Sequence, residues 1–255
     1  MRITRAATPT SRPPEPPAPR ASDRRADASI TPTPTLPWRT FRSWFTATWQ
    51  QGEHVTLIGT TGSGKTTLAA QILGARNYIV IFGVKGRDSS MDKFLGMGFI
   101  RIPEWSWNEI SNYLVLWPKI RGYGHVQKQR EVFADAMDAI YRQGGWCVVF
   151  DEVSYLSDTL SMDRQLKFML QQGRSSGISI VGMTQRPAFI PLAFYDQASH
   201  LFIWRDNDRR NRQRIGELAG NASAVVQREV ADLRKREVLY LHKDSGYRVK
   251  TTVEV

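Results

Sequence analysis

Apolar and polar positions along the chain predict buried strands that alternate with amphipathic helices. Short apolar, β-branched runs are typical of buried strands, and they occur at residues 54–58, 78–84, 99–102, 146–150, 178–183 and 201–204. Helical spacing predicts helices at residues 65–73 and 127–143, and around 162–170. Residues 106–109 have the capping-box pattern, which predicts another helix start. This alternation favours an α/β fold with a mostly parallel central sheet flanked by helices.

The two ends of the chain differ from this core. Residues 1–36 are rich in proline and arginine and poor in large apolar side chains, so we expect a disordered leader that is either solvated or a tether for a partner. From residue 37 to 255 we expect a single domain, opened by an aromatic helical stripe at Trp38, Phe41, Trp44, Phe45 and Trp49. Its extension, residues 205–255, predicts helices at 208–218 and 222–234 and a hairpin of strands 238–242 and 247–253.

Composition narrows the class of protein. The 255 residues carry a formal net charge of +11, which makes a polyanionic partner plausible. Cys147 is the only cysteine and lies in an apolar run, so it predicts a buried side chain and no disulfide within the chain. No run of about 18 apolar residues and no apolar segment after Met1 is present, so we expect a cytoplasmic protein without a membrane span or signal peptide. The four histidines lack metal-ligand spacing, which argues against a zinc site.

A glycine-rich loop carries the clearest chemistry. Residues 59–66 match the complete phosphate-loop pattern G-x-x-x-x-G-K-[ST], between a predicted strand and a predicted helix. Glycines let successive backbone N–H groups wrap around phosphates at a helix N-terminus. Lys65 is expected to reach the β- and γ-phosphates, and the Thr66 hydroxyl to ligate Mg²⁺. The expected nucleotide-binding residues are Gly59, Thr60, Thr61, Gly62, Ser63, Gly64, Lys65, Thr66 and Thr67.

Two acids follow a later buried strand. Asp151 and Glu152 come directly after the apolar run 147–150, and parallel strands bring their carboxyl ends to the edge of the sheet where the phosphate loop lies. Asp151 is then placed to hold Mg²⁺ through water, and Glu152 to orient and deprotonate the attacking water.

Three further side chains are candidates near this site. Gln185 ends the next buried strand, where its amide is either a sensor of the γ-phosphate or a loop amide without a ligand. Arg174 is a candidate arginine finger for the site of a neighbouring subunit, and Arg186 competes for that role. An ordinary surface arginine is the alternative for both.

Together these segments resemble the FtsK-HerA branch of ASCE P-loop ATPases. The resemblance rests on residues 59–66, on Asp151 and Glu152, and on residues 173–178 running to the Thr-Gln-Arg-Pro sequence at 184–187. It implies a RecA-like sheet, ATP and Mg²⁺ as cofactors, a homo-hexameric or other ring, and movement of double-stranded DNA through that ring. It also implies that Glu152, Lys65, Gln185 and Arg174 are catalytic and that Thr66 and Asp151 hold the metal.

The small size is most similar to viral genome-packaging ATPases of this branch, which implies a host-cytoplasm or virion location and a capsid or membrane-vertex partner. Two departures are visible. Val84 stands where the branch has an aspartate before Lys85, and no counterpart of the DNA-reading winged helix follows. The alternatives are a conjugation or secretion ATPase of the same branch and an ATP-dependent assembly switch that is not a motor.

Weaker features concern the polyanion. The arginines between residues 205 and 214 would form a basic helix face for DNA phosphates or a merely solvated face. Residues 119–125 predict either a pore loop or an ordinary exposed loop. Trp105, Trp107 and Trp117 are candidates for stacking on bases, with core packing as the alternative.

Overall fold

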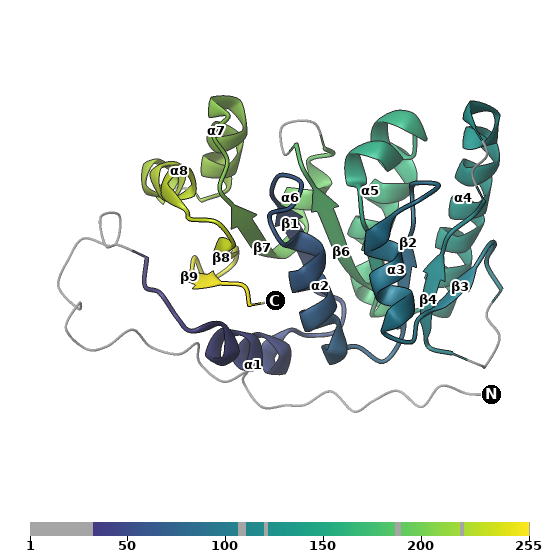
Figure 1. Ribbon diagram of the computed structural model, residues 1–255, viewed down its shortest axis with the longest axis horizontal. Coiled ribbons are helices and arrows are strands. Elements are labelled where there is room, and N and C mark those ends of the chain that lie inside the picture. The colour runs from purple at the N-terminus through teal and green to yellow at the C-terminus, as the bar shows by residue number, and fades with distance from the viewer. Residues whose placement is uncertain (1–32, 107–110, 120–121, 187–189, 220–221, 255) are drawn as a thin grey trace.

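The computed structural model describes residues 33–106, 111–119, 122–186, 190–219 and 222–254. Within these residues a nine-stranded sheet runs through the molecule in the order β3-β4-β2-β5-β6-β1-β7-β8-β9 (Figure 1). Neighbouring strands from β3 to β7 are parallel, and β8 and β9 add an antiparallel hairpin. The strands are β1 His54–Ile58, β2 Ile79–Phe82, β3 Ile100–Ile102, β4 Tyr113–Leu116, β5 Cys147–Phe150, β6 Ser179–Thr184, β7 Ala198–Trp204, β8 Glu237–His242 and β9 Arg248–Thr252. The predicted α/β fold and C-terminal hairpin are confirmed.

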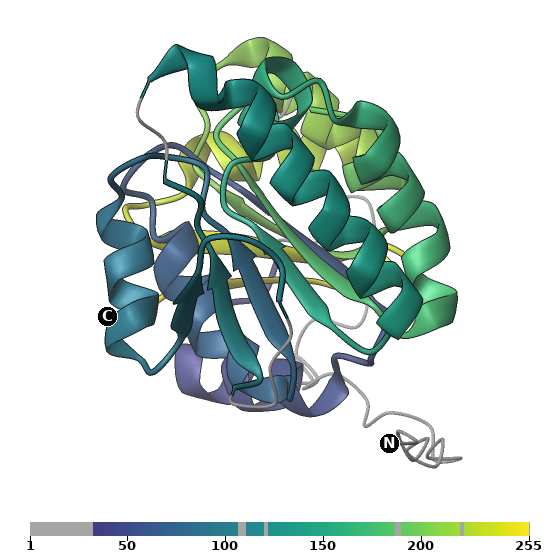
Figure 2. The same cartoon turned by 90° about the vertical axis from the view of Figure 1, so that its right-hand side faces the viewer.

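Helices cover both faces of this sheet (Figure 2). One face carries α1 Trp38–Thr48, α2 Lys65–Ile72 and α3 Ser89–Gly96. The other carries α4 Val126–Gln143, α5 Asp163–Gln172, α6 Ala193–Asp196, α7 Arg209–Leu218 and α8 Ser223–Asp232. The apolar strand residues serve both layers because successive side chains point to opposite faces. In β2, for example, Val80 and Phe82 join one buried cluster, while Ile79 and Ile81 join the other.

The first helix closes the sheet at its hairpin end. Phe41 and Phe45 are fully buried and lie 5.0 and 5.8 Å, centroid to centroid, from the ring of Tyr240 on β8. The predicted aromatic stripe is therefore a packing face. The chain is already ordered before this helix, although residues 33–36 fall within the expected leader. Thr33 donates its backbone N–H and its hydroxyl to Glu229 of α8, and Thr35 bridges to Lys250 of β9.

Among the helices and strands named above, the sequence prediction missed three, α3, α6 and β4. The strand β4 has only four residues, with Trp117 directly after it, and it pairs with β2 in parallel. Apart from Ser106, the capping box at 106–109 lies outside the described residues, but residues 113–116, into which a helix opened there would continue, form β4. No helix in the part of the chain that the structure describes is long and apolar enough to cross a membrane.

Candidate active site

The glycine-rich loop joins β1 to α2, as the sequence predicts. Its first backbone N–H, that of Gly59, donates to the carbonyl of Thr184 at the end of β6, 3.1 Å away. Gly62 and Gly64 have φ values of 76° and 112°, which residues with a Cβ rarely adopt. Beneath the loop, Trp204 of β7 approaches so closely that a Cβ on Gly59 would lie 2.9 Å from its Cβ. The loop is thus bent and supported so that amide groups at the start of α2 surround its interior.

Lys65 lies over this loop at the first position of α2. Its side chain is buried, and its ammonium donates to the carbonyl oxygens of Gly59 and of Thr60, the latter at 3.0 Å. Burial lowers the pKa of Lys65 to about 8, against the opposing effect of the carboxylates of Glu152 and Asp151. A bound polyphosphate would supply the negative charge that stabilises this ammonium.

The two predicted acids lie at the end of β5, two strands from β1. Glu152 accepts hydrogen bonds on both carboxylate oxygens, from the Ser154 hydroxyl at 2.6 Å and from the Gln185 amide at 2.8 Å. Gln185 in turn accepts from the Thr61 hydroxyl on the phosphate loop at 2.7 Å. A chain of hydrogen bonds, Thr61–Gln185–Glu152, therefore joins the loop to the ends of β6 and β5. The sequence-predicted residues Glu152 and Gln185 are brought together with the loop.

Asp151 is held in an environment that disfavours its charged form. Burial and the nearby Asp88 carboxylate raise its pKa to about 6, whereas the ammonium groups of Lys85 and Lys65 oppose this shift. Asp88 was not recognised in the sequence. It caps α3 by accepting from the backbone N–H of Ser90 at 2.9 Å, and its other oxygen lies 3.6 Å from the Lys85 ammonium. A cation near Asp151 would relieve the repulsion between the two carboxylates.

A second hydrogen-bonded chain positions the segment after Glu152. That segment, Tyr155–Thr159, forms a single turn of π-helix, a conformation that often occurs at functional sites. The Tyr155 hydroxyl donates to Gln129 at 2.9 Å, and the Gln129 amide donates to the Val84 carbonyl at 3.0 Å. The loop after β2 and the segment after β5 are therefore tied together through α4. No sequence motif signalled Tyr155 or Gln129.

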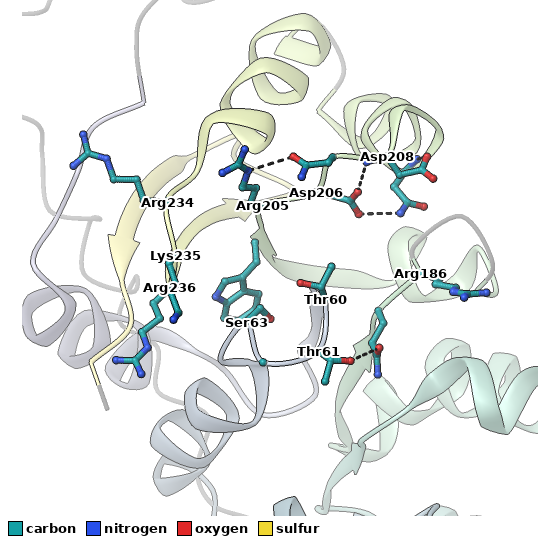
Figure 3. Close-up of a pocket in the computed structure, with 15 residues that line it drawn as sticks. Thr60, Thr61, Ser63, Arg186, Arg205, Asp206, Asp208, Arg234, Lys235 and Arg236 are labelled. Atoms are coloured by element: carbon teal, nitrogen blue, oxygen red, sulfur yellow. Dashed lines mark hydrogen bonds between the residues drawn. The ribbon is translucent and has the colours of Figure 1, made fainter.

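A cavity of about 620 Å³ opens beside the phosphate loop and extends from the end of β6 over the end of β7 (Figure 3). It is bounded by the loop itself, by Gln185 and Arg186 after β6, by the segment after β7 and by the turn between α8 and β8. Its lining residues include Thr60, Ser63, Trp204, Asp206, Lys235 and Arg236.

Arg174 lies far from this arrangement within its own chain. It belongs to the short turn Gly173–Ser176 that precedes β6, and its guanidinium donates to the Ser199 hydroxyl near the start of β7 at 2.6 Å. The start of β6 and the start of β7 are at the edge of the sheet opposite the phosphate loop. Arg174 therefore does not join the site of its own subunit, whereas Arg186 is exposed beside Gln185.

The predicted basic face of α7 is only partly available. Arg209 and Arg210 are exposed, but Arg212 donates to the backbone carbonyl of Asp206 and Arg214 pairs with Glu217. Of the three tryptophans proposed to stack on bases, Trp117 is buried and bonded to the Lys85 carbonyl, Trp105 packs against Trp146, and Trp107 lies outside the described residues.

Comparison with known proteins places this geometry in a structural class. No protein-family model matches the chain, and no curated protein matches it. Solved structures do. The genome-packaging NTPase B204 of Sulfolobus turreted icosahedral virus 2, in complex with AMPPCP, matches with a TM-score of 0.60 and 18% identity, over 80% of this chain and 100% of B204. The fold is that of a P-loop ATPase.

Two further structures extend the match. The DNA-packaging ATPase B204 of Sulfolobus turreted icosahedral virus has a TM-score of 0.57 and 16% identity, over 81% of this chain and 100% of that protein. VirB4 of Thermoanaerobacter pseudethanolicus has a TM-score of 0.61 and 10% identity, over 79% of this chain and 89% of VirB4. The predicted similarity to small packaging ATPases is thereby confirmed for the fold, which is what a likeness at such low identity shows.

Proposed function

We propose that this protein is a Mg²⁺-dependent ATPase that moves double-stranded DNA and packages a viral or phage genome into a capsid. One observation carries the hydrolytic part of this proposal. The Thr61–Gln185–Glu152 chain of hydrogen bonds joins a complete phosphate loop to an acid and an amide on two neighbouring strand ends. A carboxylate and an amide beside the expected γ-phosphate are the groups that hydrolysis of a phosphoanhydride requires.

The residues of the loop fit a magnesium nucleotide. Backbone amides from Gly59 to Thr67 would hold the phosphates, and Lys65 would exchange its bonds to loop carbonyls for bonds to the β- and γ-phosphates. Thr66 and Asp151 would hold Mg²⁺, which supplies charge neutralisation on the phosphates when bound. Among the described residues no group of three or more His, Cys, Asp or Glu is arranged as a metal cage. A hydroxyl, one carboxylate and phosphate oxygens suit Mg²⁺, which keeps several waters.

In the hydrolytic step Glu152 acts as the general base. Its carboxylate accepts a proton from a water molecule as the water oxygen bonds to the γ-phosphorus, and the bond from that phosphorus to the bridging oxygen breaks. ADP leaves with the electron pair of this bond, and Lys65 stabilises the charge that develops on the phosphates. Gln185 donates to one oxygen of Glu152 and accepts from Thr61. A γ-phosphate that changes these hydrogen bonds would therefore move the end of β6, where Gln185 lies.

The motor part of the proposal rests on charge and on assembly. The net charge of +11 and the exposed Arg209 and Arg210 suit contact with DNA phosphates. In a hexameric or other homo-oligomeric ring, Arg174 would act in the site of the neighbouring subunit, since it lies at the opposite edge of its own sheet. Genome packaging further implies a capsid or membrane-vertex partner, and a location in the host cytoplasm or the virion.

The test is the rate of ATP hydrolysis by the assembled protein with and without double-stranded DNA. We expect stimulation by DNA in the wild type, no turnover in Lys65→Ala, and retained ATP binding with strongly reduced turnover in Glu152→Gln. Equal rates with and without DNA would remove the support for a motor. Full biological activity of Glu152→Gln would favour an assembly switch, and recovery of membrane proteins in place of capsid proteins would favour a conjugation or secretion role.

A further inference from the structure

The sheet order determines which way a bound nucleotide must lie. The strand β1, which leads into the phosphate loop, has β6 on one side and β7 on the other. Glu152 and Gln185, which face the γ-phosphate in the proposed function, belong to the β5–β6 side. A triphosphate is a linear chain, so its nucleoside end has to extend toward the β7 side.

Most residues that line the cavity of about 620 Å³ are on that side, in the segment after β7 and in the turn between α8 and β8, while Gln185 and Arg186 line its β6 end. This volume is within the range of small-molecule sites, roughly 300–1,000 Å³. In Figure 3 the cavity has the phosphate loop, with Thr60 and Ser63, along one wall and the turn that carries Lys235 and Arg236 along another. Its position is therefore continuous with the place where the α-phosphate of a bound nucleotide would be.

Most side-chain acceptors in the segment after β7, which lines the cavity, are already engaged. Asp206 accepts on one oxygen from the backbone N–H of Asp208 and on the other from the Asn211 amide, at 2.8 and 2.9 Å. The Asp208 carboxylate caps α7 by accepting from the N–H groups of Arg210 and Asn211. Asn207 accepts from the Arg205 guanidinium at 3.2 Å. These hydrogen bonds hold the segment after β7 in shape and reduce the number of its acceptors that are left to read the edge of a base.

Cationic side chains line the opposite wall, on the turn between α8 and β8. Arg234, Lys235 and Arg236 are exposed and line the cavity. The backbone of their turn is fixed from both sides. Arg236 has a φ of 66°, a left-handed conformation uncommon for a residue with a side chain, and its carbonyl accepts from the Val253 N–H at 3.0 Å. A strained, held turn that carries cations is a feature that a ligand would explain.

We propose that the turn between α8 and β8 holds the nucleoside end of a bound nucleoside triphosphate through Lys235 and Arg236, with little discrimination between adenine and guanine. This inference rests on the proposed function and widens its substrate class. An ammonium and a guanidinium bind the sugar–phosphate part of a nucleotide and stack on the face of a base. ATP and GTP share the sugar–phosphate part, and each has an aromatic base face. Strong discrimination between bases would instead require unengaged donors and acceptors aimed at the base edge. Sites built in this way prefer the correct substrate by about 10⁴-fold or more over an analogue that lacks the matching group.

The experiment measures dissociation constants for Mg²⁺ complexes of ATP, GTP and inorganic tripolyphosphate by calorimetry, without DNA. The nucleoside contribution is the ratio of the tripolyphosphate constant to the ATP constant, in which non-specific charge effects cancel. The variant is Lys235→Gln/Arg236→Gln, which keeps side-chain length and removes both charges. Arg228→Gln is the control, because Arg228 is exposed on α8 and does not line the cavity.

We expect ATP and GTP to bind within about fivefold of each other in the wild type. The nucleoside contribution should fall at least about fivefold in the double variant and stay unchanged in Arg228→Gln, with circular dichroism confirming that all three proteins are folded. A nucleoside contribution unchanged in the double variant, or a preference for ATP over GTP above about 100-fold, would overturn the inference. Equal binding of ATP and tripolyphosphate by the wild type would overturn it while leaving the phosphate loop intact. If folded protein binds none of the three, the proposed function fails and the inference fails with it.

Discussion

Replacing Asp151 by asparagine should stabilise the metal-free protein while disabling its site. The pKa of Asp151 is about 6, compared with an ordinary value of 3.8, because burial and the Asp88 carboxylate disfavour the charged form. Since the folded-state pKa lies above the unfolded one, the contribution of Asp151 to stability is fully present below pH 4. It is lost as the pH rises through 6. Asparagine stays uncharged at every pH, so the free energy of unfolding of the variant should rise relative to that of the wild type across this window.

The magnitude follows from the pKa difference. About two pH units at about 1.4 kcal/mol each give about 3 kcal/mol. Asp151 is partly exposed, and solvent screens the repulsion, so we expect about 1–2 kcal/mol.

The assay is urea unfolding in EDTA at pH 5 and pH 7.5, with exposed Asp135→Asn on α4 as the matched control. The free energy of unfolding of Asp151→Asn minus that of the wild type should grow by about 0.5–1 kcal/mol between the two pH values, because about half of the full effect is already present at pH 5. The same difference for Asp135→Asn should stay constant. A difference for Asp151→Asn that does not change with pH, or that shrinks as pH rises, would refute the electrostatic account of this site.

Three further substitutions test other parts of the structure. Gly59→Ala would place a Cβ 2.7 Å from the Ser63 hydroxyl and 2.9 Å from the Trp204 Cβ, so it should cost about 1–3 kcal/mol in urea unfolding and weaken nucleotide binding. Gly74→Ala, which meets nothing within 4 Å, should not destabilise; equal effects of the two would contradict the role of Trp204 beneath the loop. Tyr155→Phe removes the hydrogen bond to Gln129 and should cost about 1 kcal/mol and lower kcat more than it raises KM; a pure KM effect would argue against positioning of Glu152. Arg174→Gln should leave nucleotide binding by the single subunit unchanged and reduce turnover only in the assembled ring, so a loss of binding in the isolated subunit would exclude a role in the neighbouring site.

The phosphate loop and the central strands could be predicted because their signals are local. A glycine pattern fixes the loop, and an apolar run of four or more residues fixes a buried strand wherever it lies in the sheet. Glu152 and Gln185 were also predictable, because strand ends of a parallel sheet meet at one edge. The structure adds the hydrogen bonds that join them to Thr61.

Other site residues carry no such local signal. Asp88 comes near Asp151 only because β2 lies beside β5, an order that the sequence does not reveal. Lys235 and Arg236 reach the loop because the hairpin folds back beside β7, so two cations about 170 residues from the loop look like ordinary surface residues in the sequence. Arg174 shows the reverse case, since its neighbours in sequence match a motif but its position is at the opposite edge of the sheet.

The most direct test of the central claim is an experimental structure with Mg²⁺ and the non-hydrolysable analogue AMPPCP. The account predicts the triphosphate inside the loop of residues 59–66, the Lys65 ammonium moved from the carbonyls of Gly59 and Thr60 onto the phosphates, and Glu152 and Gln185 facing the γ-phosphate. An analogue bound elsewhere, or a loop that keeps its Lys65 bonds while Glu152 faces no phosphate, would contradict it.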